Sequence, residues 1–310
     1  MGREKKMNKG NMWMVMLLAF ILIVNILIGV GLGVAVELFD YRISMIHLLM
    51  ISQTLMFGIP FLIYKGVTKQ SFKEILPMKP LDGKNLGYIV AITLLFLPIM
   101  MFISALGSTF TNNYVVGMLE TATSYPIWVG ILAIGVFPSF FEEIIFRGAL
   151  HKEYERFNIR TAALMNGLFF GIVHLNVQQF LYAAVIGILF TYYRHYTKSM
   201  IAPMLGHFII NGINVLMMYA AVMGEGLTDY EMYMMEDVSV WFVVGAVGVV
   251  ALMVLPILIY VLRKFRDHNI GNVEEVKPEL DEDGEVVKRP VLDIYVLISV
   301  VIFLGVYLFL

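Results

Sequence analysis

Three short polar patterns interrupt long apolar stretches of this sequence, and they are the positions best suited to chemistry. The first holds two acids and an arginine, the second a phenylalanine and a histidine, and the third a histidine and an asparagine. The residues are Glu142, Glu143 and Arg147; Phe170 and His174; and His207 and Asn211. Burying a charge in a bilayer costs at least about 2.5–3.5 kcal/mol, so ionisable residues in such stretches are candidates for function.

The first pattern separates its two carboxylates. Residues four apart share one face of a helix, so Glu143 can pair with Arg147, with the acid toward the N-terminus. Glu142 lies about 100° around the helix from Glu143 and cannot easily join that pair. We therefore expect Glu143 to be paired and Glu142 to be available for chemistry.

Glu142, His174, His207 and Asn211 together suit the hydrolysis of a peptide bond. A carboxylate in a low-dielectric site can accept a proton from water, and an imidazole can position that water or carry the proton. The tetrahedral oxyanion needs preorganised donors, and an imidazole and a carboxamide one helical turn apart can supply them. With about 1.5 Å of rise per residue, all four residues fall in the same half of the bilayer. The pattern predicts a water-filled cavity lined by these side chains.

Each residue type also has a simpler interpretation. A lone histidine on an apolar helix is more often a packing residue, and intramembrane asparagines such as Asn211 and Asn214 often hydrogen-bond neighbouring helices. Ser139 is a candidate nucleophile, although no base stands one turn from it. His47 has no acidic neighbours and is interpreted as packing. The HExxH, GxGD and GxS motifs of other membrane proteases are absent from the sequence.

The elements that must position these residues are long apolar segments. Of the 310 residues, 59% are hydrophobic and 15% are charged, whereas an ordinary soluble domain has about 25% charged residues. Segments of about 16 to 25 apolar residues match the roughly 20 that a membrane-spanning helix needs. The prediction is an all-α polytopic transmembrane bundle of about nine spans, with the short fifth and sixth forming a hairpin. The segments are 12–36, 43–64, 86–106, 126–150, 161–177, 178–193, 200–223, 238–262 and 291–310.

The basic residues predict the orientation. The first apolar run, of about 25 residues, exceeds the core of a signal peptide, so we expect it to remain as an anchor. With a cytoplasmic N-terminus, all 22 Lys and Arg residues except Arg42 lie on the cytoplasmic side or at the inner end of a span. The positive-inside rule predicts this asymmetry. We expect an integral membrane protein, of the plasma membrane if prokaryotic, with its active site toward the cytoplasmic half of the bilayer.

The domain organisation follows from one polar interruption. Residues 263–290 form the only long polar stretch and are interpreted as a solvated cytoplasmic linker before a final span. The expected units are transmembrane helices in 1–69, a catalytic core in 70–262, this linker, and a last helix in 291–310.

The patterns EExxxR, FxxxH and HxxxN, in this order on successive membrane helices, resemble those of the CPBP family. This family comprises CAAX proteases and the Abi, or bacteriocin-processing, group of intramembrane endopeptidases. The resemblance covers about residues 70–225 and implies an eight-helix-like core, followed here by an extra C-terminal span. It implies that Glu142 and His174 activate water and that His207 and Asn211 form the oxyanion hole. Glu143, Arg147 and Phe170 match as supporting residues.

The resemblance also implies a membrane-associated or lipidated peptide as the substrate. Eukaryotic members remove the three residues after a prenylated cysteine, and bacterial relatives act in bacteriocin immunity or leader-peptide processing. The family is also named a metalloprotease group, and two histidines with a glutamate could hold zinc. We favour a reaction without a cofactor, because Asn211 suits an oxyanion donor better than a zinc ligand.

Two other functions compete with the protease hypothesis. A proton-coupled transporter also places Glu, Arg and His inside the bilayer, although paired repeats are not evident in the sequence. A non-catalytic bacteriocin-immunity or scaffold protein would keep the same residues for structure. A net charge of −2 and a mean hydropathy of +0.80 leave no broad basic surface for nucleic acid. The lack of cysteine excludes disulfides and thiolate metal sites.

Overall fold

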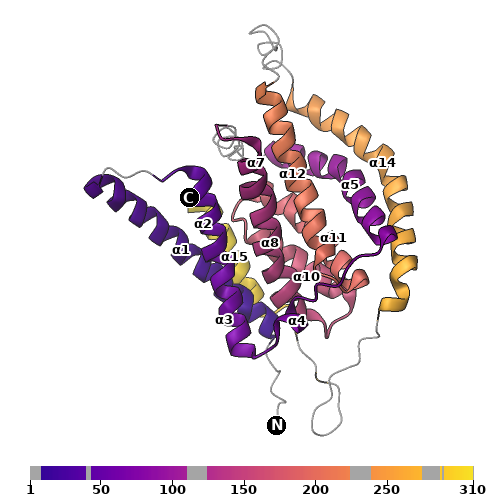
Figure 1. Ribbon diagram of the computed structural model, residues 1–310, viewed down its shortest axis with the longest axis horizontal. Helices are drawn as coiled ribbons and strands as arrows, with labels where there is room; N and C mark the ends of the chain where they lie inside the picture. The colour runs from indigo at the N-terminus through magenta and orange to yellow at the C-terminus, as the bar shows by residue number, and fades with distance from the viewer. Residues whose placement is uncertain are drawn as a thin grey trace.

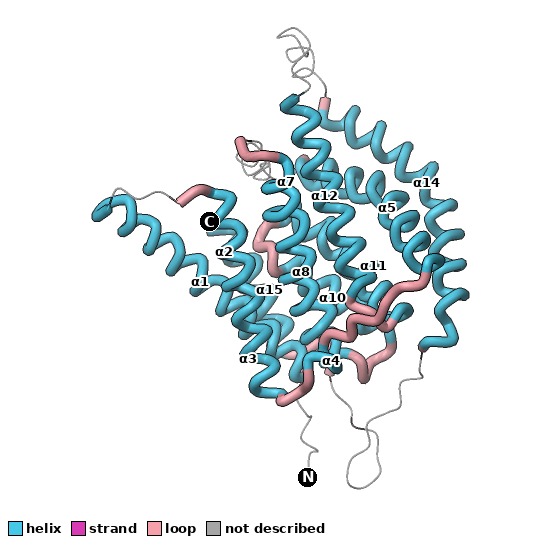
Figure 2. Tube along the Cα trace, viewed as in Figure 1, coloured by secondary structure: helices cyan, strands magenta, loops and turns pink. Residues whose placement is uncertain are grey.

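The fold is all-α, as the apolar segments predicted. The computed structural model describes residues 8–39, 43–109, 124–223, 239–273, 287 and 290–309, and these ranges contain helices and no strands (Figures 1 and 2). Three stretches, η1, η2 and η3, are π-helical. The elements in chain order are α1 (Lys9–Phe39), α2 (Met45–Gln53), η1 (Thr54–Gly58), α3 (Ile59–Thr68), α4 (Phe72–Ile75), α5 (Gly83–Ser108), α7 (Ile127–Gly130), η2 (Ile131–Val136), α8 (Phe137–Glu143), η3 (Ile144–Leu150), α9 (His151–Tyr154), α10 (Ile159–Ile172), α11 (Val177–Thr197), α12 (Ile201–Met223), α14 (Val240–Asn269), η4 (Ile270–Asn272) and α15 (Ile294–Phe309).

Every predicted apolar segment coincides with a helical stretch, but the stretches are not equivalent. Within the described ranges, six are long and apolar enough to cross a membrane: Lys9–Phe39, Met45–Thr68, Gly83–Ser108, Ile127–Tyr154, Ile201–Ala220 and Val240–Asn272. The shorter apolar helices α10 and α15 correspond to the predicted fifth and ninth spans. The sixth corresponds to α11, which packs along α10 as the expected hairpin.

Several helices begin at a short polar side chain that binds a free backbone N–H group. Asp82 accepts a hydrogen bond from the Asn85 N–H at 2.7 Å, and Asn176 accepts one from the Gln179 N–H at 3.0 Å. These are N-caps, which satisfy donors that the first turn of a helix leaves unpaired. The bond from Asn85 also lowers the pKa of the Asp82 carboxyl group below its ordinary value.

The stretch that contains the two glutamates lies at the centre of the bundle. It is surrounded by α10, α11 and α12, with α1, α2, α3 and α15 on one side and α5 and α14 on the other (Figures 1 and 2). Of its most apolar window 56% is buried, compared with 17% in Val240–Asn272. The first pattern is therefore in the core, whereas α14 is peripheral.

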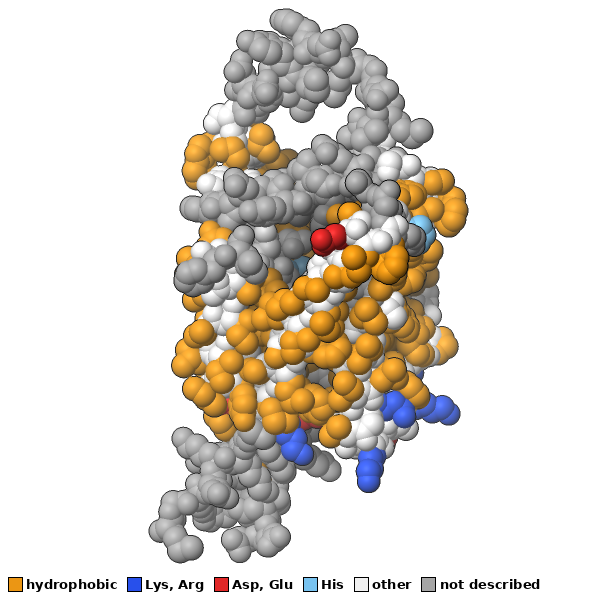
Figure 3. All heavy atoms as spheres, turned by 90° about the vertical axis from the view of Figure 1, so that its left-hand side faces the viewer, with side chains coloured by type: hydrophobic (Ala, Val, Ile, Leu, Met, Phe, Trp, Pro, Cys, Tyr) orange, Lys and Arg blue, Asp and Glu red, His pale blue; other side chains and the backbone are white. Residues whose placement is uncertain are grey.

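The outer surface is apolar. Figure 3 shows a face covered by hydrophobic side chains, with lysine and arginine gathered at one end. On α1, Ile23 is 55% exposed, and Ile26 and Leu27 are each 64% exposed. A contiguous surface of this kind fits lipid and not water, so the protein is an integral membrane protein.

Loops that were predicted to share the cytoplasmic side meet at one end of the bundle. The Ser199 hydroxyl donates to the Lys79 carbonyl at 2.6 Å, which joins the loop before α12 to the loop before α5. The Asn11 side chain donates to the Val291 carbonyl at 3.0 Å, which joins the beginnings of α1 and α15. The compartment that this end faces stays a prediction, as do the domain boundaries.

Some predictions fall on residues that the structure does not describe. These are the position of Arg42, most of the two loops near 107–125 and 224–237, and most of the 263–290 linker.

Candidate active site

The centre of the site is an ion pair held inside the bundle. Glu143 ends α8, and Arg147 lies one turn later in η3; both side chains are 0% exposed, and Nη1 of Arg147 is 3.0 Å from Oε1 of Glu143. The pair predicted from the spacing is therefore present. Nη2 of Arg147 also donates to the Gly187 carbonyl of α11 at 3.0 Å, and the guanidinium lies 4.5 Å from the Phe170 ring centre. The arginine thus ties η3 to α10 and α11.

A glycine makes this arrangement possible. A Cβ atom on Gly187 would lie 2.8 Å from the Gly167 Cα and 3.3 Å from Nη2 of Arg147. Small residues let membrane helices approach closely, and here they bring α10, α11 and η3 within reach of one guanidinium.

His207 connects the ion pair to Glu142. Its Nδ1 lies 2.9 Å from the same Glu143 Oε1 that Arg147 binds, and its Nε2 lies 3.9 Å from Oε2 of Glu142. The other oxygen of Glu143 is buried, and no described residue hydrogen-bonds to it. Because a carboxylate accepts hydrogen bonds, Nδ1 of His207 is the protonated nitrogen, and Nε2 is directed toward Glu142. Sequence spacing assigned Glu143 only to Arg147, so this second bond is a new feature.

Glu142 is also held by a residue that the sequence analysis missed. Its side chain is buried, and its Oε1 accepts a hydrogen bond from Nε2 of Gln53, at the end of α2, at 3.1 Å. The amide oxygen of Gln53 is buried, with no hydrogen-bond partner in the part of the chain that the structure describes. A lone glutamine within an apolar span was the available signal, because such residues seldom stand in a membrane without a partner. The partner is 89 residues away in sequence and could not be inferred.

His174 lies in the turn between α10 and α11, not inside a continuous helix. α10 ends at Ile172, earlier than the predicted end at 177, because Asn176 caps the start of α11. Nδ1 of His174 lies 2.7 Å from the Phe170 carbonyl, so it is the N–H donor and leaves Nε2 free to accept. The next residue, Leu175, has φ of 52°, a conformation that costs energy for a side chain of this size and that is typical of functional turns.

Phe170 lies between the two imidazoles. Its ring centre is 5.1 Å from that of His174 and 5.9 Å from that of His207, both edge-on. His174 also interacts electrostatically with Glu142 and His207. The structure therefore brings together six of the seven predicted residues, namely Glu142, Glu143, Arg147, Phe170, His174 and His207.

Asn211 is linked to the other six residues less directly. It lies one turn after His207 on α12, and its Nδ2 donates to the Ile134 carbonyl of η2 at 2.9 Å. A carboxamide nitrogen carries two hydrogens, so one donor stays available. Asn214 is exposed, and the Ser139 hydroxyl donates to the Val136 carbonyl at 2.9 Å, which is a local bond within its own helix.

Zinc is the metal that the two histidines and Glu142 could hold by residue type. Within the described ranges, no group of three or more His, Cys, Asp and Glu side chains could hold a metal ion. Zinc binds its ligands at about 2.0–2.2 Å, so the described residues do not form a site with three such ligands around one point.

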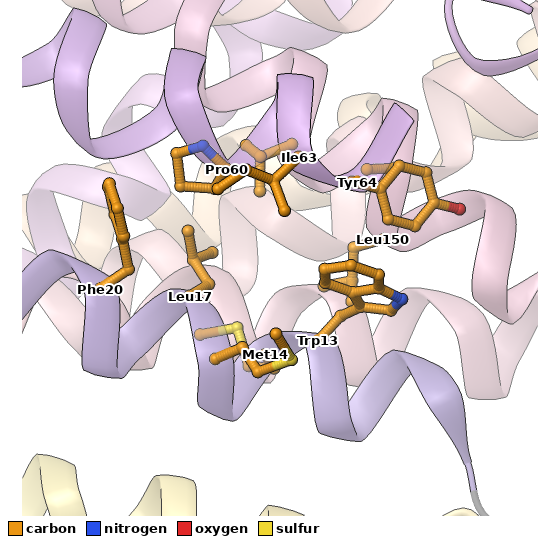
Figure 4. A pocket seen from close by; sticks show the side chains of 11 residues that line it. Trp13, Met14, Leu17, Phe20, Pro60, Ile63, Tyr64 and Leu150 are labelled. Carbon is orange, nitrogen blue, oxygen red and sulfur yellow. The ribbon is translucent and has the colours of Figure 1, made fainter. Parts of the chain in front are cut away.

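An apolar pocket of about 100 Å³ lies beside η3, between α1 and α3 (Figure 4). Trp13 and Leu17 of α1, Pro60 and Tyr64 of α3, and Leu150 of η3 contribute to its wall. Glu142, His174 and His207 do not line it, so this pocket borders the candidate site without containing its polar groups.

Comparison with known proteins bears on this central region. Residues 124–213 match the family model described as Type II CAAX prenyl endopeptidase Rce1-like. The matched region contains all seven residues of the three sequence patterns, and it confirms the family predicted from them. No curated protein and no solved structure matches the chain.

Proposed function

Because residues 124–213 match the model of the Rce1-like type II CAAX prenyl endopeptidases, we propose that this chain is an intramembrane endopeptidase of that family. The observation that carries the proposal is the buried Glu142 carboxylate, fixed by Gln53 at 3.1 Å and with Nε2 of His207 at 3.9 Å. A carboxylate that is held in place beside two imidazoles suits the activation of water for attack on a peptide carbonyl.

Water activation is assigned to Glu142 and His174. The carboxylate takes a proton from water as the oxygen attacks the carbonyl carbon, and the proton then passes to the leaving amine. His174 donates through Nδ1 to the Phe170 carbonyl at 2.7 Å, so its Nε2 is the atom that accepts a hydrogen bond from the water. The bond to Phe170 fixes both the tautomer and the direction of the ring.

Oxyanion stabilisation is assigned to His207 and Asn211. Glu143 accepts from Nδ1–H of His207 at 2.9 Å and fixes the direction of the ring, so a proton on Nε2 would be placed to be donated to the developing oxyanion. The second hydrogen of the Asn211 amide is the other donor. Arg147 and Phe170 position these groups and do not contact the reacting atoms.

The proposed substrate is a membrane-associated or lipidated peptide, either of the CAAX type or a leader or bacteriocin peptide. The apolar outer surface supports this class, because the substrate must reach a site inside the bilayer. We place the site toward the cytoplasmic half, at the side to which the basic loops converge. A non-catalytic immunity or scaffold role and proton-coupled transport are the alternatives that the experiment must separate from peptidase activity.

The test uses the purified full-length protein in liposomes with a prenylated peptide that ends in a CAAX sequence. Glu142→Gln should lower kcat by about 10²- to 10⁴-fold, which is the usual contribution of a general base. Glu155→Gln is the matched control, because Glu155 is an exposed glutamate outside the site. Products identified by mass spectrometry give the cleaved bond, and a parallel series with chelator checks for a metal requirement. Unchanged cleavage by a folded Glu142→Gln protein would refute the proposal.

A further inference from the structure

The C-terminal helix α15 contributes to the core of the bundle, although it lies outside residues 124–213, which match the family model. It packs against α1 and α10 (Figure 1). Val296, Ser299 and Phe303 are 7%, 0% and 6% exposed, and their spacing of three and four residues places them on one face of the helix. Val296 and Phe303 belong to the same hydrophobic core as Phe170 of the candidate site. The face that carries them is therefore turned toward the bundle and not toward lipid.

Side-chain amides from the beginning of α1 fix the position of α15 along the bundle. The Asn8 amide donates to the Pro290 carbonyl at 3.3 Å, and the Asn11 amide donates to the Val291 carbonyl at 3.0 Å. The Tyr154 hydroxyl of α9 donates in turn to the side-chain oxygen of Asn11. These bonds set the level at which the later residues of α15 meet the neighbouring helices.

Phe303 meets the first turn of α11. Its ring centre lies 5.1 Å from that of Phe180, and the two rings are tilted by 40°. Phe180 also packs closely against the last turn of α10, because a Cβ atom on Gly171 would lie 2.7 Å from Cδ2 of Phe180 and 2.9 Å from its carbonyl oxygen. The lack of a side chain at Gly171 thus lets Phe180 contact α10 and α15 together.

Gly171 and Phe180 lie on the two sides of the turn that carries His174. The Gly171 carbonyl accepts from the His174 N–H at 3.2 Å, and the Phe180 N–H donates to the Asn176 carbonyl at 2.8 Å. Between these bonds lies Leu175 with its φ of 52°, a conformation that persists only where the surrounding structure holds it. The contact between Phe180 and Gly171 joins the two ends of the turn, and α15 packs on the ring that makes this contact.

We propose that Phe303 and Phe180 are positioning residues for His174. Phe303 restrains Phe180, Phe180 restrains the turn, and the turn sets where the His174 ring lies relative to Glu142 and the attacking water. The inference rests on the proposed function, because the position of His174 affects the rate only if this residue acts on the water. A contact that served packing alone would support stability and leave the rate of the folded enzyme unchanged.

The experiment compares the full-length wild type with Phe303→Ala, Phe303→Leu and two controls in one detergent. Val296→Ala removes apolar volume from the same face of α15, and Phe265→Ala removes a buried ring of the same size from α14. Each protein is assayed for kcat and KM with the prenylated CAAX peptide, and for hydrogen exchange of the backbone amides in residues 171–180 by mass spectrometry. Glu142→Gln is included to show that the cleavage belongs to the proposed site.

Phe303→Ala should lower kcat by about 10- to 100-fold with little change in KM, because a small displacement of a catalytic group is enough for such a loss. It should also speed exchange of the His174 and Leu175 amides by at least about 10-fold, since both amides are bonded within the turn. Phe303→Leu should restore most of both properties, and the two control variants should change neither.

An unchanged kcat in Phe303→Ala, with cleavage still lost in Glu142→Gln, would overturn the inference and leave the proposed function standing. Equal effects in Phe303→Ala and Phe265→Ala would also overturn it, as would a lower kcat with unchanged exchange of the turn. If wild type does not cleave the peptide, the proposed function fails on its own, and exchange alone decides whether Phe303 holds the turn. If Phe303→Ala does not fold, Phe303→Val takes its place with the same expected results.

Discussion

The ion pair between Glu143 and Arg147 provides a direct test of how burial sets the strength of a charge interaction in this bundle. Its nitrogen and oxygen are 3.0 Å apart, and both side chains are 0% exposed. The Lys152–Glu155 pair is at 2.7 Å, with side chains that are 30% and 40% exposed. The two pairs differ much more in burial than in distance. Removing one partner of a buried pair costs about 3–5 kcal/mol, whereas an exposed pair contributes about 0–1 kcal/mol.

We expect Glu143→Gln to destabilise the protein by about 3–5 kcal/mol, because Arg147 would remain charged and buried with only a carbonyl and aromatic rings around it. Glu155→Gln should lower the stability by no more than about 1 kcal/mol. The double variant Glu143→Gln/Arg147→Met should recover part of the loss, because it leaves no buried charge alone. The coupling energy between the two sites should be about 1–3 kcal/mol.

The assay is denaturant-induced unfolding of each variant in one detergent at one protein concentration. Binding of His207 to Glu143 makes the same substitution a test of the site, so cleavage is measured on the folded fraction. Equal losses of stability for Glu143→Gln and Glu155→Gln would show that burial does not govern this pair. A double variant that is less stable than the sum of the two single losses would also contradict the reasoning.

Three further predictions follow from single contacts. Gln53→Leu should lower kcat about 10-fold or more with little change in KM, because it removes the hydrogen bond that holds the Glu142 carboxylate at 3.1 Å. An unchanged kcat in the cleavage assay would show that Gln53 does not contribute to the site. Gly187→Ala should destabilise the protein by about 1–3 kcal/mol, because the new Cβ would lie 2.8 Å from the backbone of α10. Gly212→Ala is the control: open space surrounds its Cβ, so it should be neutral or stabilising, and equal unfolding midpoints for the two variants would refute this. Asp82→Ala should lower the free energy of unfolding by about 1 kcal/mol at neutral pH. Because the pKa of Asp82 is lowered in the folded state, the stability difference between wild type and variant should shrink as the pH falls through this pKa. A stability difference that stays constant down to pH 2 would count against the N-cap.

The helices could be predicted from the sequence because the signal is local. Long apolar runs specify a span without reference to any other part of the chain, and the pairing of Glu143 with Arg147 follows from their spacing on one helix. The end of α10 was harder to predict. The apolar pattern continues to Val177, whereas the N-cap at Asn176 and the left-handed Leu175 divide the run into two helices. That division puts His174 on a turn.

Contacts between distant segments could not be predicted in the same way. Gln53 and Glu142 are 89 residues apart, and His207 and Glu143 are 64 residues apart. The sequence shows these residues as polar positions within apolar spans, but many pairs of such residues lie at similar depths in the bilayer. The packing of α2 and α12 against α8 determines which of these pairs form. A single sequence does not show which helices pack against each other.

The two adjacent glutamates have different hydrogen-bond partners, and this difference supports the separate roles that we propose for them. Oxygen Oε1 of Glu143 accepts from both Arg147 and His207, at 3.0 and 2.9 Å, so two donors hold this carboxylate in the interior. Among the described residues, Glu142 accepts one bond, from the neutral amide of Gln53, and its one ion-pair contact is with the His207 ring at 3.9 Å. Glu143 is therefore suited to fix the direction of the His207 ring, and Glu142, which lies outside the ion pair, is suited to take the proton from water in the proposed reaction. The i and i+1 spacing makes both roles possible, because it directs the two carboxylates to different faces of one buried helix.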